Sequence, residues 1–398
     1  MNKFFNYAAV LLAAIALSAC GGGDNTSSNE ELLASSVTVA DGSVDEMRIS
    51  AGTTHTAGLN TNGTAYTWGR NDHGQLGNGN SNSSNTPVPV VGLSAITAIR
   101  VGDIHTVALK TDGTVWTWGD NVDGQLGNPS YNWSSTPLKV PGLSGVKAVA
   151  AGQAHTVALK ADGSVWGWGR TSVTSSRAPV MVAGLNNVKT VVAGQGYTVA
   201  LKNDGTVWAW GANSSGQLGN GTITSSANPV PVIGLSGVKS ISAGQAHTLA
   251  LKNDGSVWAW GSNTYGQLGN TGGLARTPVP VAGLSGVKSI GAGAYNSVAL
   301  STAGTVLAWG DNYYGQLGNG THNSSYKPTA VSSITGGVAI SAGTGYAIVL
   351  KSDGTVFGFG LNSSGQLGNR STNSASLPVQ AVGVNGYGFL NLGNSASH

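Results

Sequence analysis

The chain has a single cysteine, Cys20, among its 398 residues. One thiol cannot form an intramolecular disulfide, so the fold must be held together by packing and hydrogen bonds alone. Charged residues are also scarce, at 9%, which argues against long amphipathic helices with charged outer faces. The 62 glycines and 11 tryptophans instead favour many short strands joined by tight turns. We therefore predict an all-β protein.

Acidic residues that could serve catalysis are few, and no glutamate follows Glu46. A hydrolase or lyase needs a placed general acid or base, usually a carboxylate or a histidine. Asp103 and His105 lie two residues apart on one strand face and could form such a pair, but no nucleophile is placed beside them. We expect no catalytic residues and no cofactor, and an enzyme of these classes is the least favoured function.

Long apolar runs are missing except at the N-terminus, where residues 4–17 follow Lys3. This run is too short for a dedicated membrane span, and the Leu-Ser-Ala-Cys sequence that ends at Cys20 resembles a bacterial lipoprotein signal. We expect residues 1–19 to be removed as a signal peptide, which leaves Cys20 as the lipidated, palmitate-bearing first residue. The competing interpretation is a buried N-terminal helix with a free thiol.

The stretch after the cysteine predicts where the protein resides. Gly21 stands in the place of an aspartate, which resembles lipoproteins exported to the outer membrane of Gram-negative bacteria. Residues 20–46 are rich in Gly, Ser, Asn and acidic residues, and this composition predicts a flexible linker. The expected location is the bacterial cell envelope, with the protein anchored by its lipid to the outer membrane.

The rest of the chain repeats one unit seven times. A small residue followed by glycine opens each copy, at intervals of 49 or 50 residues and once of 42. The glycines of these pairs are Gly52, Gly102, Gly152, Gly194, Gly244, Gly293 and Gly343. A period near 50 residues indicates a propeller or a solenoid, in which each repeat cannot bury its apolar faces alone.

Each unit begins with a predicted β-hairpin. In the fifth copy, residues 247–252 alternate so that His247, Leu249 and Leu251 share one face. Asp254-Gly255 then supplies a turn, and Trp258 and Trp260 share one face of the next strand. Paired tryptophans at this spacing are typical of core residues that press against the small-residue face of a neighbouring sheet. The aspartate is thereby explained as a turn former.

A second motif, Gly-Gln-Leu-Gly, follows the aromatic strand in every copy except the third, and an asparagine precedes it by three positions. We interpret this segment, which we call the clasp, as structural, because its glycines permit positive φ and its amide side chains can satisfy loop backbone groups. A proline-bearing strand comes next, and proline favours the edge of a sheet.

Four strands in each of seven units predict a seven-bladed β-propeller over residues 47–393, with a tail of residues 394–398. Residues 389–393 align with residues 47–51, which open the first copy. We expect the N- and C-terminal strands to close the ring, because closure removes exposed sheet edges.

The whole unit is similar to the repeats of the regulator of chromosome condensation family. The similarity rests on Ala-Gly, His-Thr-x-Ala-Leu, Asp-Gly-x-Val-Trp-x-Trp-Gly and Gly-Gln-Leu-Gly within residues 243–269, and extends over about residues 47–393. The resemblance implies a seven-bladed propeller that binds other proteins through loops at its ends. Family functions include nucleotide exchange on a nuclear small GTPase, which does not fit an exported lipoprotein, and inhibition of secreted β-lactamases by a bacterial propeller, which fits its compartment.

Two recurring positions invite functional interpretations that the repeat explains more simply. His55, His105, His155 and His247 share one position that is Tyr or Asn in other copies, which fits a hydrogen-bonding strand residue better than a metal ligand. Lysines form two rings that could bind an anionic glycan or lipid surface, yet nothing aromatic is consistently interleaved with them. These rings are Lys110, Lys160, Lys202, Lys252 and Lys351, and Lys147, Lys189, Lys239 and Lys288.

Residues that break the repeat are the better candidates for partner binding, since exposed aromatic residues on rigid loops are typical interface anchors. The third copy, which lacks the clasp, should also leave a notch bordered by two arginines, unless it is simply a degenerate blade. The candidates are His73, Tyr131, Trp133, Tyr265, Tyr313, Tyr314, Arg170 and Arg177.

The function expected from the sequence is therefore a non-catalytic protein–protein interaction module, held at the membrane by its lipid. Its partner is an unidentified periplasmic or extracellular protein, and we expect a monomer that binds no nucleic acid and no metal. The alternatives are binding of anionic glycan or lipid through the lysine rings and inhibition of a secreted enzyme.

Overall fold

The computed structural model describes residues 37–38, 48–129 and 132–393. The chain divides into two compact units, residues 1–32 and 33–398. The first unit, which includes the expected signal peptide and Cys20, lies outside the described residues, as do most of the expected linker and the tail. All the strands that the structure describes belong to the second unit.

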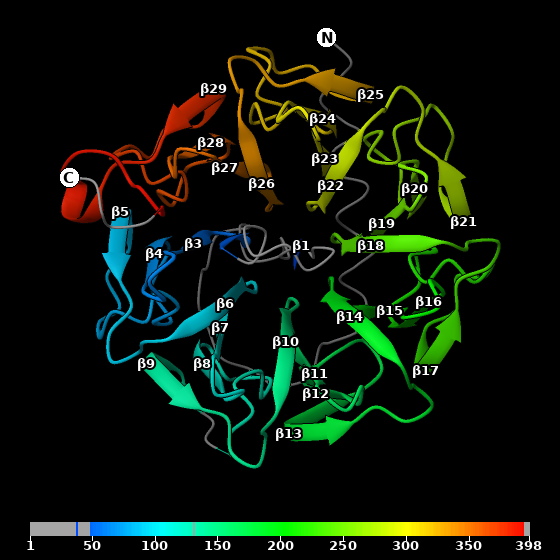
Figure 1. The fold of residues 1–398 in the computed structure, drawn as a ribbon, viewed down its shortest axis with the longest axis horizontal. Helices are drawn as coiled ribbons and strands as arrows, with labels where there is room; N and C mark the ends of the chain where they lie inside the picture. The colour runs from blue at the N-terminus through cyan, green and yellow to red at the C-terminus, as the bar shows by residue number, and fades with distance from the viewer. Residues whose placement is uncertain (1–36, 39–47, 130–131, 394–398) are drawn as a thin grey trace, which may run out of the picture. The chain divides into compact units, whose positions relative to one another are not determined.

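Seven antiparallel sheets of four main strands radiate from a common centre, as Figure 1 shows with the chain coloured from blue to red around the ring. This arrangement confirms the predicted all-β, seven-bladed β-propeller. Each blade is built from one continuous stretch of sequence, and its strands follow one another from the centre outward as A, B, C and D. Among the described residues the only helical element is a short 3-10 turn, η2 (Val384–Gly386), and no helix there is long and apolar enough to cross a membrane.

The strands of each kind occupy equivalent repeat positions, with small differences in length. The A strands are β2 (Ile49–Ala51), β6 (Ile96–Val101), β10 (Val146–Ala151), β14 (Val188–Ala193), β18 (Val238–Ala243), β22 (Val287–Ala292) and β26 (Gly337–Ala342). The B strands are β3 (His55–Leu59), β7 (His105–Lys110), β11 (His155–Lys160), β15 (Tyr197–Lys202), β19 (His247–Lys252), β23 (Asn296–Ser301) and β27 (Tyr346–Lys351).

The outer two kinds follow the same order. The C strands are β4 (Ala65–Gly69), β8 (Val115–Gly119), β12 (Val165–Arg170), β16 (Val207–Gly211), β20 (Val257–Gly261), β24 (Val306–Gly310) and β28 (Val356–Gly360). The D strands are β5 (Ser84–Pro89), β9 (Ser134–Lys139), β13 (Ser175–Met181), β17 (Ser226–Pro231), β21 (Ala275–Pro280), β25 (Ser325–Ala330) and β29 (Ala375–Gln380). Every D strand carries a proline and lies at the outer edge of its sheet, as predicted.

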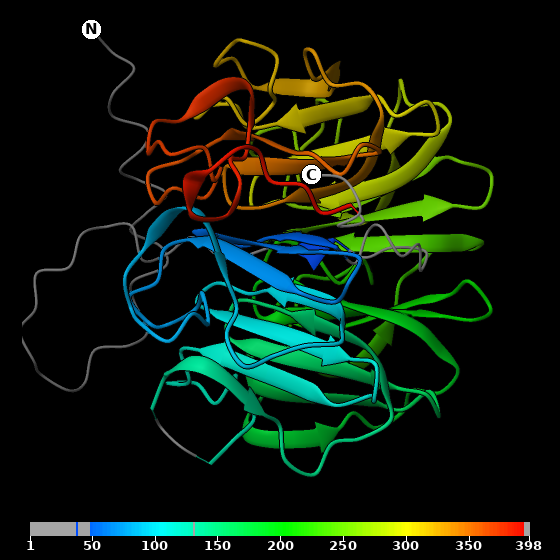
Figure 2. The same ribbon diagram turned by 60° about the vertical axis from the view of Figure 1, so that its left-hand side comes forward.

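The direction of the strands gives the propeller two different ends. Because neighbouring strands are antiparallel, the A–B and C–D connections emerge at one end of the ring, and the B–C and D–A turns emerge at the other. Figure 2 shows the blades closer to edge-on, packed against one another around the ring. We call the first end the clasp end, since the clasps lie in the C–D connections, and the second the turn end.

The chain ends meet at blade 1, whose A strand β2 has three residues where the other A strands have six. The C-terminal segment completes it: the Leu392 N–H donates to the Gly354 carbonyl (2.8 Å), and the Thr61 N–H donates to the Leu392 carbonyl (3.3 Å). Leu390 and Leu392 are buried in the same apolar cluster as Ile49. Within the stretch expected to be a linker, β1 (Val37–Thr38) pairs antiparallel with β18 near the centre.

Tryptophans of the C strands form much of the packing between blades, but the two rings of each pair differ in burial. The second ring, such as Trp118, is fully buried, whereas the first, such as Trp116, is only half-buried. The predicted core role is therefore correct for the second ring only. Each first ring is covered by the lysine that ends the B strand, with its Nζ 5.7 Å from the ring centroid for Lys110 and Trp116.

A ring of hydrogen bonds around the centre joins the blades. The first residue of each B strand is called here the ring residue. At every junction except that between blades 6 and 7, it reaches a hydroxyl on the B strand of the next blade: His105 Nε2 lies 3.0 Å from Thr156 Oγ1. The other ring histidines make the same bond, and Tyr197 and Tyr346 replace it with their own hydroxyls. These side chains are structural, as the variation between His and Tyr suggested.

The clasps join the same blades from their outer side. At five junctions, the carbonyl of the clasp glutamine accepts two hydrogen bonds from the next blade, one from the hydroxyl of the ring and one from the buried indole. Gln75, for example, accepts from Thr106 (2.8 Å) and Trp118 (2.9 Å). The last clasp glycine, Gly77, has φ 66°, and a Cβ there would lie 2.5 Å from the Trp118 Nε1, so no larger residue fits.

The junction between blades 6 and 7 lacks these bonds. Its ring residue is Asn296, whose two amide atoms are buried with no partner, and the next blade offers Ala347 and Phe359 in place of a hydroxyl and an indole. A buried amide without partners destabilises a fold by about 1–3 kcal/mol. This junction is therefore the weak point of the ring.

Restoring the missing bonds should stabilise the protein. Asn296→His combined with Ala347→Thr should raise the free energy of unfolding by about 2 kcal/mol, because it adds two buried hydrogen bonds and removes two unpaired amide atoms. Urea denaturation of the double variant and of both single variants measures the gain and its coupling. As the matched control, His247→Asn with Ser297→Ala at the preceding junction should lower stability by a similar amount. A double variant no more stable than the native chain would contradict the assigned role of the ring.

The buried histidines predict a loss of stability in acid. Burial lowers the pKa of His55, His105 and His247 to about 3 and that of His155 to about 4. The unfolded chain, with histidine pKa values near 6.5, binds more protons below that pH, so the free energy of unfolding should fall as the pH drops from about 6.5 toward 4. At pH 5 each ring histidine should cost about 2 kcal/mol.

A single substitution measures how much of this acid sensitivity comes from one ring histidine. His105→Tyr copies Tyr197 and Tyr346, keeps a hydroxyl at the junction and removes one titrating group. Urea denaturation at pH 7 and pH 5 should show that the variant loses roughly 2 kcal/mol less than the native chain. An equal loss in both proteins would mean that His105 does not titrate on unfolding.

Candidate interaction surface

The clasp loops are rigid platforms for variable side chains. In blade 1, Asn71 Oδ1 accepts from the Leu76 N–H (2.9 Å), its Nδ2 donates to the carbonyls of Asn80 and Asn82 (3.0 Å each), and Gln75 Oε1 accepts from the His73 N–H (2.9 Å). The same pattern recurs in the loops of blades 5 and 6. The expected structural role of these amides is confirmed. The backbone of the residues just before the clasp is thereby fixed, while their side chains differ from blade to blade.

The candidate residues come from the C–D segments of different blades, and so gather at the clasp end. His73 lies in blade 1, Trp133 in blade 2, Tyr265 in blade 5, and Tyr313 and Tyr314 in blade 6. Of these, Trp133 and Tyr313 are the most exposed, at 48% and 68%. Tyr131 lies outside the described residues.

Four tyrosines on blades 5 and 6 form two contacting pairs, which we together call the aromatic patch. The ring centroids of Tyr265 and Tyr295 lie 5.1 Å apart, and those of Tyr313 and Tyr314 lie 4.9 Å apart with the rings at 89°. Burial raises the pKa of Tyr295, which stands in an A–B loop just before the ring residue. Sequence reasoning missed Tyr295, although it also breaks the repeat: Thr54, Ile104 and small residues occupy this position in the other blades.

Charged side chains occupy the same end over blades 1 to 3. Asp72 lies between Arg70 and His73 in one loop, and the Asp72 carboxylate, 3.1 Å from His73 Nδ1, raises the pKa of that histidine. Asp103 is not the partner of His105, whose Nε2 is bound to Thr156 in the next blade. The possible acid–base pair is therefore not formed. Burial does raise the pKa of Asp103 to about 7.

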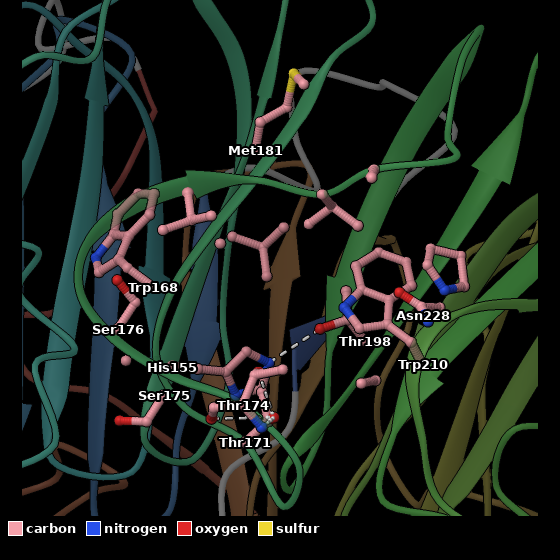
Figure 3. Close-up of a pocket in the computed structure, with 18 residues that line it drawn as sticks. His155, Trp168, Thr171, Thr174, Ser175, Ser176, Met181, Thr198, Trp210 and Asn228 are labelled. Carbon is pink, nitrogen blue, oxygen red and sulfur yellow. Dashed lines mark hydrogen bonds between the residues drawn. The ribbon is translucent and has the colours of Figure 1, made fainter.

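The two arginines of blade 3 bind the preceding blade and do not border the notch. Arg170 forms an ion pair with Asp123 (2.6 Å), and Arg177 donates to the carbonyls of Asn121 (3.2 Å) and Val122 (2.6 Å). The expected notch lies on the other side of blade 3, as a cavity of about 320 Å³ between blades 3 and 4 (Figure 3). Neither arginine is among the residues that line it.

The lysine rings stand at the turn end, and much of their binding capacity is used within the protein. Lys110, Lys160, Lys202, Lys252 and Lys351 each cover an aromatic ring, contrary to the expectation that no aromatic residue accompanies them. Three of these also contact the aspartate of the adjoining turn, as Lys351 does at 3.2 Å from Asp353. In the second ring, Lys189 and Lys288 donate to backbone carbonyls of the next blade.

Nothing in the described part of the chain brings three or more His, Cys, Asp or Glu side chains together at a distance suited to a metal ion. The ring histidines bind hydroxyl groups at separate junctions. What the clasp end offers chemically is a set of aromatic and charged side chains on rigid loops, which suits recognition of another molecule.

Comparisons with known structures agree with this architecture. Prp20p from Saccharomyces cerevisiae, a protein described for its binding to Gsp1p and histones, superposes with a TM-score of 0.75 at 23% identity, over 88% of this chain and 90% of that one. Human WBSCR16 superposes with a TM-score of 0.73 at 22% identity, over 80% and 94% of the two chains. At these identities the similarity shows the fold alone. No curated protein sequence matches the chain.

Models of sequence families give the relationship directly. The model of the RCC1-like domain matches residues 170–397, and models of the regulator of chromosome condensation (RCC1) repeat match residues 62–109 and 112–159, and residues 48–75 and 96–125. Because the first of these alone covers more than half of the sequence, the chain belongs to the RCC1-like domain family.

Proposed function

We propose that this protein is an exported, lipid-anchored propeller that binds another protein through its clasp end and performs no catalysis. The observation that carries the proposal is the aromatic patch together with Trp133: Tyr313 and Trp133 are exposed, and the clasps hold the loops that carry Tyr265, Tyr313 and Tyr314. Tyrosine and tryptophan on a rigid support are the residues that most often dominate binding energy at protein interfaces.

Related folds give the proposal its precedent. Prp20p binds Gsp1p and histones, and yeast RCC1 (Prp20) has been solved in complex with Kap60, at a TM-score of 0.75, 23% identity and coverage of 93% and 91% of the two chains. These partners belong to those proteins, and our proposal takes from them only the use of the propeller as a protein-binding module. Inhibition of a secreted enzyme would be one form of this function.

Export and anchoring are proposed from the N-terminal sequence. The apolar run at residues 4–17 and the Leu-Ser-Ala-Cys sequence that ends at Cys20 resemble a lipoprotein signal, and Gly21 favours the outer membrane of the bacterial envelope. A lipid at Cys20 and a linker to residue 46 would tether the propeller to the membrane surface. The partner would then be a protein of the envelope or its surroundings.

Binding of anionic glycan or lipid is the second candidate, because lysines are concentrated at the turn end. It is less favoured, since five of the lysines already lie over aromatic rings and two donate to backbone carbonyls. Such binding should weaken steeply with salt, whereas aromatic contacts at the clasp end should not.

Removing an aromatic anchor should weaken partner binding. We expect Tyr313→Ala and Trp133→Ala each to reduce capture of the partner from solubilised cell envelope by the full chain at least about tenfold. The control is Lys239→Ala at the turn end, which should leave capture unchanged. If the lysine variant loses capture in a salt-dependent manner and the aromatic variants do not, the turn end is the binding surface.

The anchor has its own test. Cys20→Ser should abolish incorporation of radiolabelled palmitate and release the protein from the membrane fraction, because a thiol is the site of acylation. Gly21→Asp is the matched control: it should keep the label but shift the protein from the outer to the inner membrane. A Cys20→Ser protein that remains in the membrane fraction would contradict lipid anchoring.

A further inference from the structure

The junction between blades 3 and 4 has hydrogen-bond donors but lacks the acceptor that serves them elsewhere. Five junctions use one glutamine carbonyl to accept from a ring hydroxyl and a buried indole. Blade 3 has no clasp. Thr198 and Trp210 of blade 4 still supply the hydroxyl and the indole N–H, but there is no clasp glutamine whose carbonyl could accept from them. No acceptor for the Trp210 Nε1–H is found in the described part of the chain, although the side chain is buried, with 5% exposed.

The freed donors face a cavity. Figure 3 shows the indole nitrogen of Trp210 beside the hydroxyl of Thr198, both turned toward the space between the blades. The Thr198 oxygen lies 3.1 Å from His155 Nε2; if that ring donates, as at the junctions with a clasp, the hydroxyl proton of Thr198 remains available. The indole N–H faces this open space, where it can donate to water or to the carbonyl of a bound partner.

The cavity also lacks the apolar side chain that a clasp would supply. Leucine of every clasp is fully buried, and in blade 1 its carbonyl accepts from Thr67 on the C strand (2.6 Å). The equivalent residue of blade 3 is Gly167, and a Cβ built there meets nothing closer than 3.9 Å. Val180, opposite Gly167, is 53% exposed, whereas its counterparts Val230 and Val279 are half-buried.

We propose that this cavity, between β12–β13 and β16–β17, is a binding site for a turn of a partner protein. The turn would supply a backbone carbonyl to Trp210 and Thr198, followed by an aliphatic side chain to the space beside Gly167. Its chemistry is that of a Gly-x-Leu-Gly turn, which the other blades provide for themselves. The volume of about 320 Å³ lies at the lower end of the range for ligand sites. The inference rests on the proposed function as a protein-binding module and names one of its contact sites.

The clasp of the protein itself supplies the probe. The capped peptide Ser-Ser-Gly-Gln-Leu-Gly-Asn, which copies residues 214–220, is titrated into the full chain labelled with ¹⁵N. The indole N–H signal of Trp210, assigned by its loss in Trp210→Phe, should move downfield as it acquires an acceptor. The peptide with alanine in place of leucine should bind at least about tenfold more weakly, because the aliphatic contact is lost.

Three variants separate binding from folding. Trp210→Phe removes the N–H donor together with part of the ring and should weaken peptide binding about tenfold; Phe359 at the equivalent position of blade 7 shows that the fold accepts a phenyl ring. Trp260→Phe is the matched control at a junction whose donor already has the Gln217 carbonyl, and should leave peptide affinity unchanged. Gly167→Leu fills the cavity from within and should abolish binding without lowering the melting temperature.

The outcomes distinguish this site from the proposed function. No movement of the Trp210 signal at millimolar peptide, or binding that persists in Gly167→Leu, overturns the site. Capture of the envelope partner that is lost in Tyr313→Ala but retained in Gly167→Leu overturns only the role of the cavity and leaves the proposed function intact. Peptide binding with no captured partner in any variant overturns the proposed function but not the site. Self-association of the chain that Gly167→Leu abolishes would assign the site to a second copy, and would overturn a separate partner.

Discussion

One carbonyl oxygen at five of the seven junctions, that of the clasp glutamine, is the constraint on which the packing of the blades depends. A backbone carbonyl oxygen has two lone pairs, and here both accept hydrogen bonds from the next blade, one from a hydroxyl and one from an indole N–H. The same hydroxyl also meets the ring residue of the preceding blade. Apolar burial between sheets is strong but non-directional, so it allows a sheet to slide. Directional bonds at the centre and at the clasp remove that freedom and fix the register of each blade against its neighbours.

Much of this could be read from the sequence, because strand period, turn residues and edge prolines are local signals. The Asp-Gly turns show why: Asp112 Oδ1 accepts from the Thr114 N–H (3.0 Å) two residues away, a contact made within one hairpin. The ring and clasp bonds between blades join residues 30 to 51 positions apart, or about 300 where the ring closes, and a repeat seen alone gives no hint of them. The cover of Trp116 by Lys110 was missed for a different reason: the two belong to neighbouring strands, and their contact depends on the register of the hairpin.

The exceptions to the repeat are informative because the rule is so regular. At the junction of blades 6 and 7 the ring residue, the hydroxyl and the indole are all replaced, by Asn296, Ala347 and Phe359, so the Gln316 carbonyl is left with neither donor. Three replacements in one junction indicate that the network works as a unit, because the loss of one member leaves the others without a hydrogen-bond partner. Between blades 3 and 4 the opposite has happened: the clasp is gone and both donors remain.

The two ends of the propeller differ in how far their recurrent residues are already used within the fold, and this difference bears on which end meets a partner. At the turn end, the recurrent residues are already occupied, the aspartates by turn backbone and the lysines by aromatic rings, so changing them costs local structure. At the clasp end, Asn and Gln hold each clasp loop through amide contacts, so the loop does not depend on the side chains of the two positions before the clasp, although Asp123 pairs with Arg170 of the next blade. Tyrosine occupies one of these positions in blade 5 and both in blade 6, and tyrosine makes large contacts for little loss of conformational entropy. A rigid loop that carries aromatic side chains suits a binding surface, and the clasps supply such loops in blades 5 and 6.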